Sequence, residues 1–408
     1  MSTPVLRVAI VGCGVIGRQH ATVVAANPGL ELVVVVDPLP MVGTALADSA
    51  RVAGHPRPEV YTDLAAALVH ETIDLVAICT PSGLHATLAV QALEAGAHVV
   101  IEKPIDVDLA SARAVMSAAD AARLRGQVTS VISQHRFDAG SVAVSRAIES
   151  GRFGRVTSAV ASLAWWRAQD YYDSGEWRGT WDLDGGGAVM NQGVHTVDLL
   201  LWFLGTPVEV HAYTALAAHE RIEVEDTAVA TVRFESGALA VIHCTTAAYP
   251  GLTARLQVHG DRGSAVLDND RLSYFHAAGD DPESGSSYGL AGRGNQAAEE
   301  VGERESAENT SGADDLLSAH ERQYADVVTA IRSGVDPVVG VREAASALAL
   351  VRAIYVSATV GRAVDFTDVL NGSYDELVVA TGGSALDGAA GLQRDPEARI
   401  ALQRTSGQ

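Results

Sequence analysis

The hydrophobic and polar positions of this 408-residue chain change their spacing along the sequence. From residue 8 to residue 133, short apolar runs alternate with stretches of helical spacing. After the apolar runs at 8–11 and 33–36, strands are predicted at 73–79, 98–101 and 128–133, and helices at 63–69, 84–95 and 108–124. This alternation indicates a doubly wound parallel sheet. Residues 1–133 are therefore predicted to form one domain of this kind.

Beyond residue 133 the spacing changes to the period of two that is typical of strands. The stretch 225–234 places one set of alternate residues on a single face: Asp226, Ala228, Ala230, Val232 and Phe234. Further strands are predicted at 238–246, 253–259, 264–267 and 271–275, and helices at 316–331 and 341–360. Residues 134–370 are thus predicted to form an α/β domain with an open, mainly antiparallel sheet. A free face of such a sheet can cover substrate or pair two subunits.

Two segments offer few apolar residues to bury. Residues 277–315 are rich in glycine and serine and carry ten acids against two arginines. They are predicted to form a mobile surface excursion. Residues 371–408 are polar and glycine-rich, and are predicted to form a loosely held tail.

Three glycines follow the first apolar run with the spacing G-x-G-x-x-G. Gly12 permits a tight turn, Gly14 lets the backbone approach a pyrophosphate, and Gly17 lets the first helix pack on the first strand. Because the helix begins near Gly14, the backbone around Val15 and Ile16 is expected to bind the phosphates. The spacing alone also fits a structural turn, but the strand, the helix and the second strand all fall at the offsets of a dinucleotide-binding Rossmann domain.

An acid, Asp37, ends the second apolar run twenty residues after Gly17. It is placed to accept hydrogen bonds from both hydroxyls of the adenine-side ribose. Its charge would repel a 2′-phosphate, and the following Pro-Leu-Pro-Met supplies no Arg or Lys to bind one. The sequence therefore predicts NAD as the cofactor, in preference to NADP.

Two further strand ends carry candidate residues, because the carboxyl ends of parallel strands line the ligand crevice. Thr80 and Pro81 are expected to border the nicotinamide half of the cofactor, and His85 to reach its ribose; local packing is the alternative for His85. Glu102 and Lys103 follow the strand at 98–101 and are also expected near the cofactor. Lys103 is expected to point into the crevice, where its charge can stabilise a developing alkoxide.

The stretch 184–205 combines a glycine triplet, two polar residues and a long apolar run. The triplet predicts a close-packed helix entry, and Gly205 predicts the end of the helix. Asn191 and His195 are four residues apart, which places them on one face of a helix. His195 can accept a hydroxyl proton near neutral pH, as oxidation of a secondary alcohol requires, whereas a packed core histidine is the alternative.

Aromatic residues crowd the segment before this helix in a chain that is 5% aromatic overall. Aromatic faces with a few directional polar groups suit a sugar, although ordinary loop packing is the alternative for any single ring. The residues expected to contact substrate here are Trp166, Arg167, Tyr171, Tyr172 and Arg178, together with Asn191 and His195.

Composition excludes several classes of protein. With 29 basic and 50 acidic residues, the net charge of −21 opposes nucleic-acid binding. The three cysteines are far apart and no C-x-x-C or H-E-x-x-H motif occurs, so no metal site is predicted. No signal peptide or bilayer-spanning run is recognised in the sequence, which favours a cytoplasmic location without membrane partners.

Taken together, these motifs resemble the Gfo/Idh/MocA family of NAD(P)-dependent sugar and cyclitol oxidoreductases. The resemblance covers residues 5–368 and rests on the glycine fingerprint, T-P-x-x-x-H, E-K-P and the helix from the glycine triplet to His195. It implies a Rossmann domain, a second α/β domain and a homodimer or homotetramer, with Lys103 and His195 as catalytic residues. Asn191 stands where inositol dehydrogenases of the family have aspartate. The N-Q-G-x-H version is more similar to members acting on nucleotide-sugars and glycosides.

Three functions remain open at this stage. The first is a dehydrogenase that moves hydride from a secondary hydroxyl of a sugar, glycoside or cyclitol to NAD. The second is an NAD-dependent glycosidase that oxidises the ring transiently, for which Tyr171 or Tyr172 would supply an extra base. The third is a catalytically silent nucleotide-sensing protein, against which the intact Lys103 and His195 argue.

Overall fold

The computed structural model describes residues 4–278, 294–302 and 313–381. The chain forms two compact units. The first comprises Met1–Phe137 and Ser311–Leu348, and the second comprises Asp138–Thr310 and Ala349–Gln408. Most of the predicted acidic excursion and most of the predicted tail lie outside the described residues.

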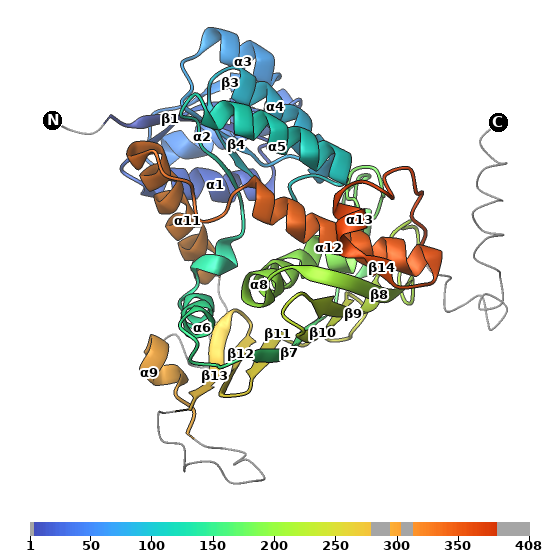
Figure 1. The fold of residues 1–408 in the computed structure, drawn as a ribbon. Helices are drawn as coiled ribbons and strands as arrows, with labels where there is room; N and C mark the ends of the chain where they lie inside the picture. The colour runs from blue at the N-terminus through green and yellow to red at the C-terminus, as the bar shows by residue number, and fades with distance from the viewer. Residues whose placement is uncertain (1–3, 279–293, 303–312, 382–408) are drawn as a thin grey trace, which may run out of the picture. The chain divides into compact units, whose positions relative to one another are not determined.

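A six-stranded sheet forms the centre of the first unit (Figure 1). Its strands are β1 (Leu6–Val11), β2 (Leu30–Val36), β3 (Glu59–Tyr61), β4 (Leu75–Ile78), β5 (His98–Ile101) and β6 (Thr129–Val131). They lie in the order β3-β2-β1-β4-β5-β6, and every neighbouring pair is parallel. This is the strand order of the Rossmann fold, in which the ligand binds at the reversal between β1 and β4. The predicted parallel sheet is confirmed.

The helices that connect these strands begin and end where local sequence directs. They are α1 (Val15–Ala26), α2 (Pro40–Val52), α3 (Leu64–His70), α4 (His85–Glu94) and α5 (Leu109–Arg123). The side chains of Asp63 and Asp108 each accept a backbone N–H group at the start of α3 and α5, at 2.9 and 2.8 Å. Gly96 and Gly126 follow α4 and α5 in the left-handed region, with φ of 97° and 83°.

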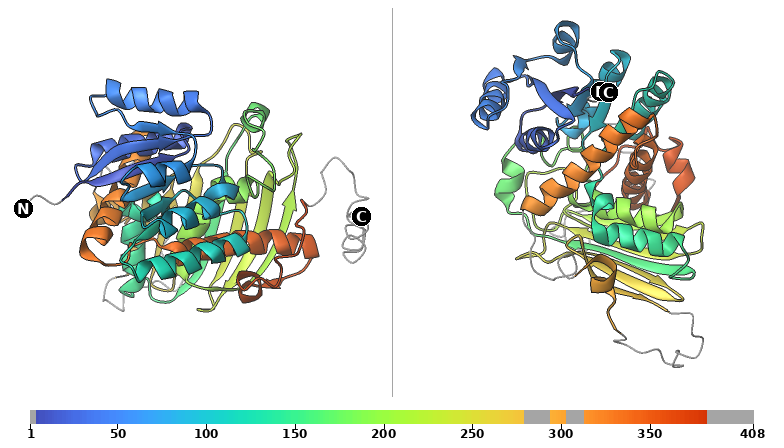
Figure 2. Two further views of the ribbon diagram at one scale, coloured as in Figure 1. Left: turned by 90° about the horizontal axis from the view of Figure 1, so that it is seen from above. Right: turned by 90° about the vertical axis from the view of Figure 1, so that its left-hand side faces the viewer.

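The first unit also contains a helix from much later in the sequence, α11 (Ala313–Ser333), which lies beside α1 (Figures 1 and 2). Its residues Tyr324, Val327 and Val328 are buried in the same core as β1. The Gln323 side chain also binds the end of the edge strand β6. Its Oε1 accepts the Ser133 N–H at 3.0 Å, and its Nε2 donates to the Val131 carbonyl at 2.8 Å.

An eight-stranded sheet forms the centre of the second unit, and its strands lie side by side as one layer (Figure 2). They are β7 (Val156–Ala164), β8 (Pro207–Ala215), β9 (Thr227–Phe234), β10 (Leu239–Thr245), β11 (Ala254–Gly260), β12 (Gly263–Asp268), β13 (Arg271–Ala277) and β14 (Val364–Asp365). The order is β13-β12-β11-β7-β10-β9-β8-β14, with only β7 and β10 parallel among the neighbouring pairs. These strand directions confirm the predicted mainly antiparallel sheet. The predicted face of β9 is also buried, from Asp226 to Phe234.

Helices cover one face of this sheet, and the one that concerns the site is α8 (Val194–Leu204), which packs on β7 and β11. The others in this part of the chain are α6 (Ala139–Glu149), α7 (Gln169–Asp173), α9 (Ala297–Val301) and α13 (Phe366–Leu370). α8 ends at Gly205, whose φ is 83°. That ending agrees with the sequence prediction.

One described helix, α12 (Val341–Val360), has the length and composition to cross a membrane, with a mean hydropathy of 1.3. Buried residues make up 61% of the apolar window. Leu348, Val351 and Tyr355 are among them. A core helix meets the same criteria, so length and composition alone do not identify α12 as a membrane span.

Candidate active site

The glycine fingerprint forms a tight turn between β1 and α1. Gly12 has a φ of 91°, and a Cβ on Gly17 would lie 1.9 Å from the Gly12 carbonyl oxygen. Both positions therefore require glycine. A Cβ on Gly14 would meet nothing within 4 Å, so this residue faces open space at the start of α1.

The start of α1 is suited to an anion. It has no side-chain cap and no acid in its first turn. Val15 and Ile16 at this position are 65% and 39% exposed. The first backbone N–H groups of a helix have no partner within it, and the helix dipole places positive charge there. This geometry fits the pyrophosphate of a dinucleotide.

Asp37 follows β2 and lies beside the fingerprint turn. Its Oδ2 accepts the N–H of Cys13 at 2.9 Å, and its Oδ1 accepts the N–H of Leu39 at 3.0 Å. These bonds fix the side chain, and each carboxylate oxygen keeps a lone pair for a further hydrogen bond. The carboxylate is thus oriented beside the turn that would hold the phosphates, as ribose recognition requires.

The end of β4 offers one unsatisfied group and one fully occupied group. The Thr80 hydroxyl is buried without a hydrogen-bond partner among the described residues, and it follows β4 next to Pro81. His85 is buried, with Nδ1 2.7 Å from the Pro104 carbonyl and Nε2 2.9 Å from the Thr80 carbonyl. No ring nitrogen is left for a ribose hydroxyl, so the geometry favours local packing for His85. That packing ties the end of β4 to the loop that follows Lys103.

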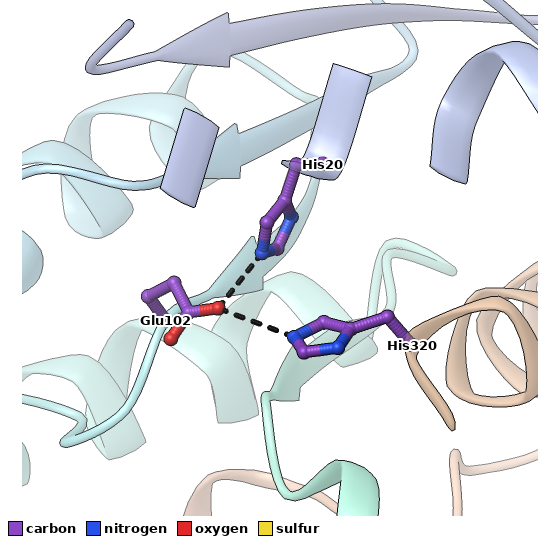
Figure 3. A group of neighbouring side chains, drawn as sticks. All are labelled: His20, Glu102 and His320. Carbon is purple, nitrogen blue, oxygen red and sulfur yellow. Dashed lines mark hydrogen bonds and ion pairs between the residues drawn. The ribbon is translucent and has the colours of Figure 1, made fainter. Parts of the chain in front are cut away.

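Lys103 follows β5 and Glu102, and it is half-buried. Glu102 is 6% exposed, and its Oε2 accepts the Lys103 backbone N–H at 3.1 Å. Its other oxygen, Oε1, lies 2.8 Å from His20 Nε2 and 3.6 Å from His320 Nε2. Figure 3 shows both rings pointing toward this oxygen. Lys103 is therefore attached to a rigid, buried polar cluster.

The cluster continues to Tyr324, whose hydroxyl is 2.7 Å from His20 Nδ1. With a proton on Nε2, His20 donates to Glu102 through that nitrogen, and its Nδ1 accepts from the Tyr324 hydroxyl. Burial alone would raise the pKa of Glu102, but the hydrogen bonds and charges of His20 and His320 hold that pKa well below its usual range. Glu102 is thus an ionised carboxylate that binds His20 and the backbone N–H of Lys103.

Three residues of this cluster have the ligand types of a metal site: His20, Glu102 and His320. The direct hydrogen bond between His20 and Glu102 and the contact of His20 with Tyr324 occupy both ring nitrogens of His20. The arrangement is therefore explained by hydrogen bonding. No sequence motif points to His320 or Tyr324, and the place of His20, three residues after Gly17, is the one local sign of this cluster.

In the second unit, the glycine triplet packs against a buried acid. A Cβ on Gly187 would lie 1.6 Å from the Glu225 carbonyl oxygen, and one on Gly186 would lie 2.2 Å from the Tyr355 hydroxyl. The Glu225 carboxylate accepts the N–H groups of Gly187 and Val189, both at 2.9 Å. The triplet is thus required for close packing at this helix entry.

Asn191 lies in a π-helical turn, η3 (Ala188–Gly193), and not in the α-helix predicted from residue spacing. Its Nδ2 donates to the Gly186 carbonyl at 2.9 Å. The spacing prediction is wrong at this turn because the buried Glu225 side chain binds the preceding backbone N–H groups, and π-turns of this kind are frequent at functional sites. His195 is in the first turn of α8, where it is partly exposed.

The aromatic segment separates into an open part and a packed part. The Tyr171 hydroxyl accepts hydrogen bonds from Arg178 Nη1 at 2.9 Å and from Gln192 Nε2 at 3.1 Å. The Arg167 guanidinium lies 5.4 Å from the centre of the same ring. Trp166 instead packs edge-on against Tyr249, with ring centres 5.4 Å apart.

Tyr172 belongs to the packed part. It is buried, its hydroxyl lies 2.8 Å from the Thr246 hydroxyl, and its ring contacts His219. Burial raises the pKa of Tyr172 well above its usual range. This environment argues against Tyr172 as a base and as a substrate contact.

The loop before β9 is fixed by His219 and Asp226, a pair that no sequence motif marks. His219 Nδ1 lies 3.0 Å from Asp226 Oδ2, and His219 Nε2 lies 2.8 Å from the Arg167 carbonyl. Burial lowers the pKa of His219, but these two acceptors outweigh burial and raise it. The pair therefore fixes the backbone at Arg167.

Comparison with known proteins agrees with this geometry. Residues 6–130 match the family model "Oxidoreductase family, NAD-binding Rossmann fold", and residues 141–266 match the "GFO/IDH/MocA C-terminal domain". The inositol 2-dehydrogenase of Rhizobium meliloti (strain 1021) is 30% identical over 282 residues, which cover 67% of this chain and 79% of that protein. The D-glucoside 3-dehydrogenase of Escherichia coli (strain K12) is 29% identical, covering 59% of this chain and 70% of that protein.

Among solved structures, the WlbA dehydrogenase from Bordetella pertussis, in complex with NADH and UDP-GlcNAcA, is similar with a TM-score of 0.76. It is 32% identical, and the match covers 90% of this chain and 99% of that one. The matched models include both the nucleotide-binding and the C-terminal parts of one family. The chain therefore belongs to the Gfo/Idh/MocA family and is an NAD-binding oxidoreductase of the sugar and cyclitol dehydrogenase type.

Proposed function

We propose that this enzyme oxidises a secondary hydroxyl of a sugar, glycoside or cyclitol. Two of its relatives are an inositol 2-dehydrogenase and a D-glucoside 3-dehydrogenase, and WlbA was crystallised with NADH and UDP-GlcNAcA. Each compound in these names contains a ring with secondary hydroxyl groups. The same kind of substrate is proposed for this chain.

The first unit fits the cofactor through its own unfilled groups. The uncapped start of α1 would bind the pyrophosphate, Asp37 the ribose hydroxyls, and the unsatisfied Thr80 hydroxyl a polar group of the nicotinamide half. Bound NAD supplies the hydride acceptor. The chain supplies binding, orientation and the handling of the hydroxyl proton.

The observation that carries the catalytic assignment concerns α8. Of its residues from Val194 to Leu204, only His195 and Trp202 are not buried. His195 is therefore the titratable side chain that this helix presents, and we assign it as the base that accepts the hydroxyl proton. Lys103 is assigned to stabilise the resulting alkoxide, and Asn191 to orient the substrate or the imidazole.

A substrate screen tests this function. Sugars, glycosides and cyclitols are incubated with NAD, and nicotinamide absorbance and released aglycone are measured in the same wells. Net NADH formation on a ring alcohol is expected. Aglycone release without net NADH would instead establish the glycosidase, and stoichiometric NADH binding without turnover of any compound would establish a sensing protein.

We further propose that the enzyme is a homodimer or homotetramer, paired through the free face of the sheet in the second unit. Apolar side chains on that face are exposed, namely Tyr213 at 69%, Leu239 at 58% and Val229 at 44%. Tyr213 and Val229 are directly opposite each other on β8 and β9. Light scattering after gel filtration checks the assembly, and Tyr213→Glu is expected to shift it toward a monomer.

A further inference from the structure

We propose that the substrate carries an anionic group, a carboxylate or a phosphate, and that Arg167 and Arg178 bind it beside Tyr171. This inference rests on the proposed function, and it narrows the substrate to charged sugars. All the residues involved lie in one unit of the chain.

The charge environment of these two arginines is the first argument. The chain has 50 acids and 29 basic residues, so carboxylates are plentiful. Elsewhere in the unit arginines pair with acids, as Arg152 does with Glu300 and Arg221 with Asp173. Within the described part of the chain, neither Arg167 nor Arg178 pairs with a carboxylate. Half-buried cations without a counter-ion are unusual in a protein with this excess of acid.

The second argument is that both guanidinium groups are held in place. Arg178 lies over two rings, 4.4 Å from the centres of both Tyr171 and Trp177. Arg167 lies 5.0 Å from the centre of the Trp165 ring and donates to the Trp166 carbonyl at 3.2 Å. Stacking on aromatic faces fixes a guanidinium and leaves edge N–H groups to bind the oxygens of a carboxylate or a phosphate.

The backbone supports this arrangement. The Arg167 carbonyl is bound by His219, which is in turn bound by Asp226. The Arg167 N–H donates to the Thr246 carbonyl at 2.9 Å. The Arg167 backbone is thus bound at both its N–H and its carbonyl, so the stacked side chain extends from a fixed main chain. The site is organised in advance, which favours affinity.

Gln192 provides an independent observation that points to a ligand. It is 6% exposed, its Nε2 donates to the Tyr171 hydroxyl at 3.1 Å, and its Oε1 is buried with no partner among the described residues. The Tyr171 oxygen already accepts two hydrogen bonds, so its own proton is available as a donor. An acceptor and a donor side by side suit a sugar hydroxyl next to the charged group.

The ligand group would be an anion whose oxygens accept hydrogen bonds from the two guanidinium groups. Such an anion has two possible sources. A uronic acid carries a carboxylate on the sugar ring, whereas a nucleotide-sugar carries a diphosphate. Four probes separate them: methyl β-D-glucoside has neither group, methyl β-D-glucuronide has the carboxylate, UDP-glucose has the diphosphate, and UDP-glucuronate has both. Binding of each to the enzyme–NADH complex is measured by titration calorimetry.

The expected result is that at least one charged probe binds tenfold or more tightly than methyl β-D-glucoside, and that this advantage falls as salt is raised. A preference for the glucuronide assigns a carboxylate, and a preference for UDP-glucose assigns a phosphate. Equal affinity for all four probes, or binding of none, overturns the proposal. No turnover is needed, so an enzyme that binds charged probes without reducing NAD refutes the proposed function and leaves this inference standing.

Variants test the residues. Arg178→Gln and Arg167→Gln are each expected to weaken binding of the charged probe about 10- to 100-fold, through loss of a charge-assisted hydrogen bond. Arg178→Lys keeps the charge but loses the paired N–H donors of the guanidinium, so a smaller loss of affinity is expected. Arg146→Gln on α6 makes the same charge change at an exposed position and is the matched control.

The decisive quantity is the ratio of charged-probe to neutral-probe affinity. In the Gln variants it is expected to fall toward one, while in Arg146→Gln it stays at the wild-type value. An unchanged ratio in both Gln variants overturns the assignment. Circular dichroism confirms that each variant is folded, and Arg178→Lys keeps the test valid if loss of stacking unfolds Arg178→Gln.

Discussion

The Tyr355 hydroxyl donates to Oε1 of Glu225 at 3.0 Å, and both side chains are buried. Glu225 joins this tyrosine on α12 to the backbone N–H groups that begin the π-helical turn of Asn191. The entry to α8 is therefore attached to a single buried carboxyl group. Burial raises the pKa of that group to about 7.

This raised pKa predicts a pH-dependent stability. The folded protein binds the Glu225 proton more tightly than the unfolded chain, whose value is near 4.5. The stabilisation is thus complete below pH 4.5 and is lost as the pH rises through about 7. Relative to Glu225→Gln, which cannot ionise, wild type is expected to lose on the order of 3 kcal/mol of unfolding free energy between these limits. Urea denaturation of both proteins from pH 5 to 8 measures this, and a difference that does not vary with pH contradicts it.

The glycine fingerprint predicts two opposite outcomes for the same substitution. Gly17→Ala would place a Cβ 1.9 Å from the Gly12 carbonyl oxygen, so the first unit is expected to lose several kcal/mol or fail to fold. Gly14→Ala meets no atom within 4 Å and is expected to fold normally. If Gly14 faces the pyrophosphate, this variant binds NADH at least tenfold more weakly. Thermal unfolding and NADH titration separate the two effects, and normal NADH affinity in Gly14→Ala would remove that residue from the site.

Cofactor preference is expected to depend on Asp37. The kcat/KM for NAD should be at least tenfold higher than for NADP. A 2′-phosphate cannot donate to the Asp37 carboxylate as a 2′-hydroxyl does, and the carboxylate charge repels it, an effect of about 1.5 kcal/mol or more. Asp37→Ala should narrow the gap, and it also removes the acceptor of the Cys13 N–H. Comparing kcat/KM for the two cofactors tests this, and equal values in wild type would sink the assignment.

The catalytic residues are expected to differ in the size of their effects. His195→Ala should lower kcat about 10²- to 10⁴-fold through loss of the general base, and Lys103→Ala should also lower it severely. Asn191→Ala removes a hydrogen bond to the Gly186 carbonyl and should be milder, roughly fivefold. NADH affinity is expected to persist in all three. Near-normal kcat in His195→Ala would exclude it as the base and direct attention to Tyr171.

Sequence pattern predicted the local elements well because their determinants are local. Asp63 and Asp108 bind N–H groups three residues away, and Gly96 and Gly126 end helices through their own φ angles. The buried face of β9 follows from alternation alone. The sequence could not show that α11 packs beside α1, because an amphipathic pattern identifies an apolar face but not its partner.

The parts of the site that pattern missed are set by distant residues. The π-turn at Asn191 depends on Glu225, which is 34 positions further along the chain. Tyr171 and Tyr172 are neighbours of the same type, yet one faces Arg178 and the other is buried against Thr246. His85 was expected at the ribose because the sequence shows its place in the T-P-x-x-x-H motif. The sequence does not show that the Thr80 and Pro104 carbonyls contact both of its ring nitrogens.

The insertion of α11 into the first unit has a consequence for biosynthesis. A ribosome completes β1 to β6 early, but the Tyr324 contact to His20 and the Gln323 contact to β6 need residues made nearly two hundred positions later. Until then, apolar surface on α1 and β1 lacks its cover. The nascent nucleotide-binding unit must therefore wait, exposed to chaperones and to aggregation, while the strands of the second unit are translated. The core of the first unit can therefore be completed only after the strands β7 to β13 of the second unit have been translated.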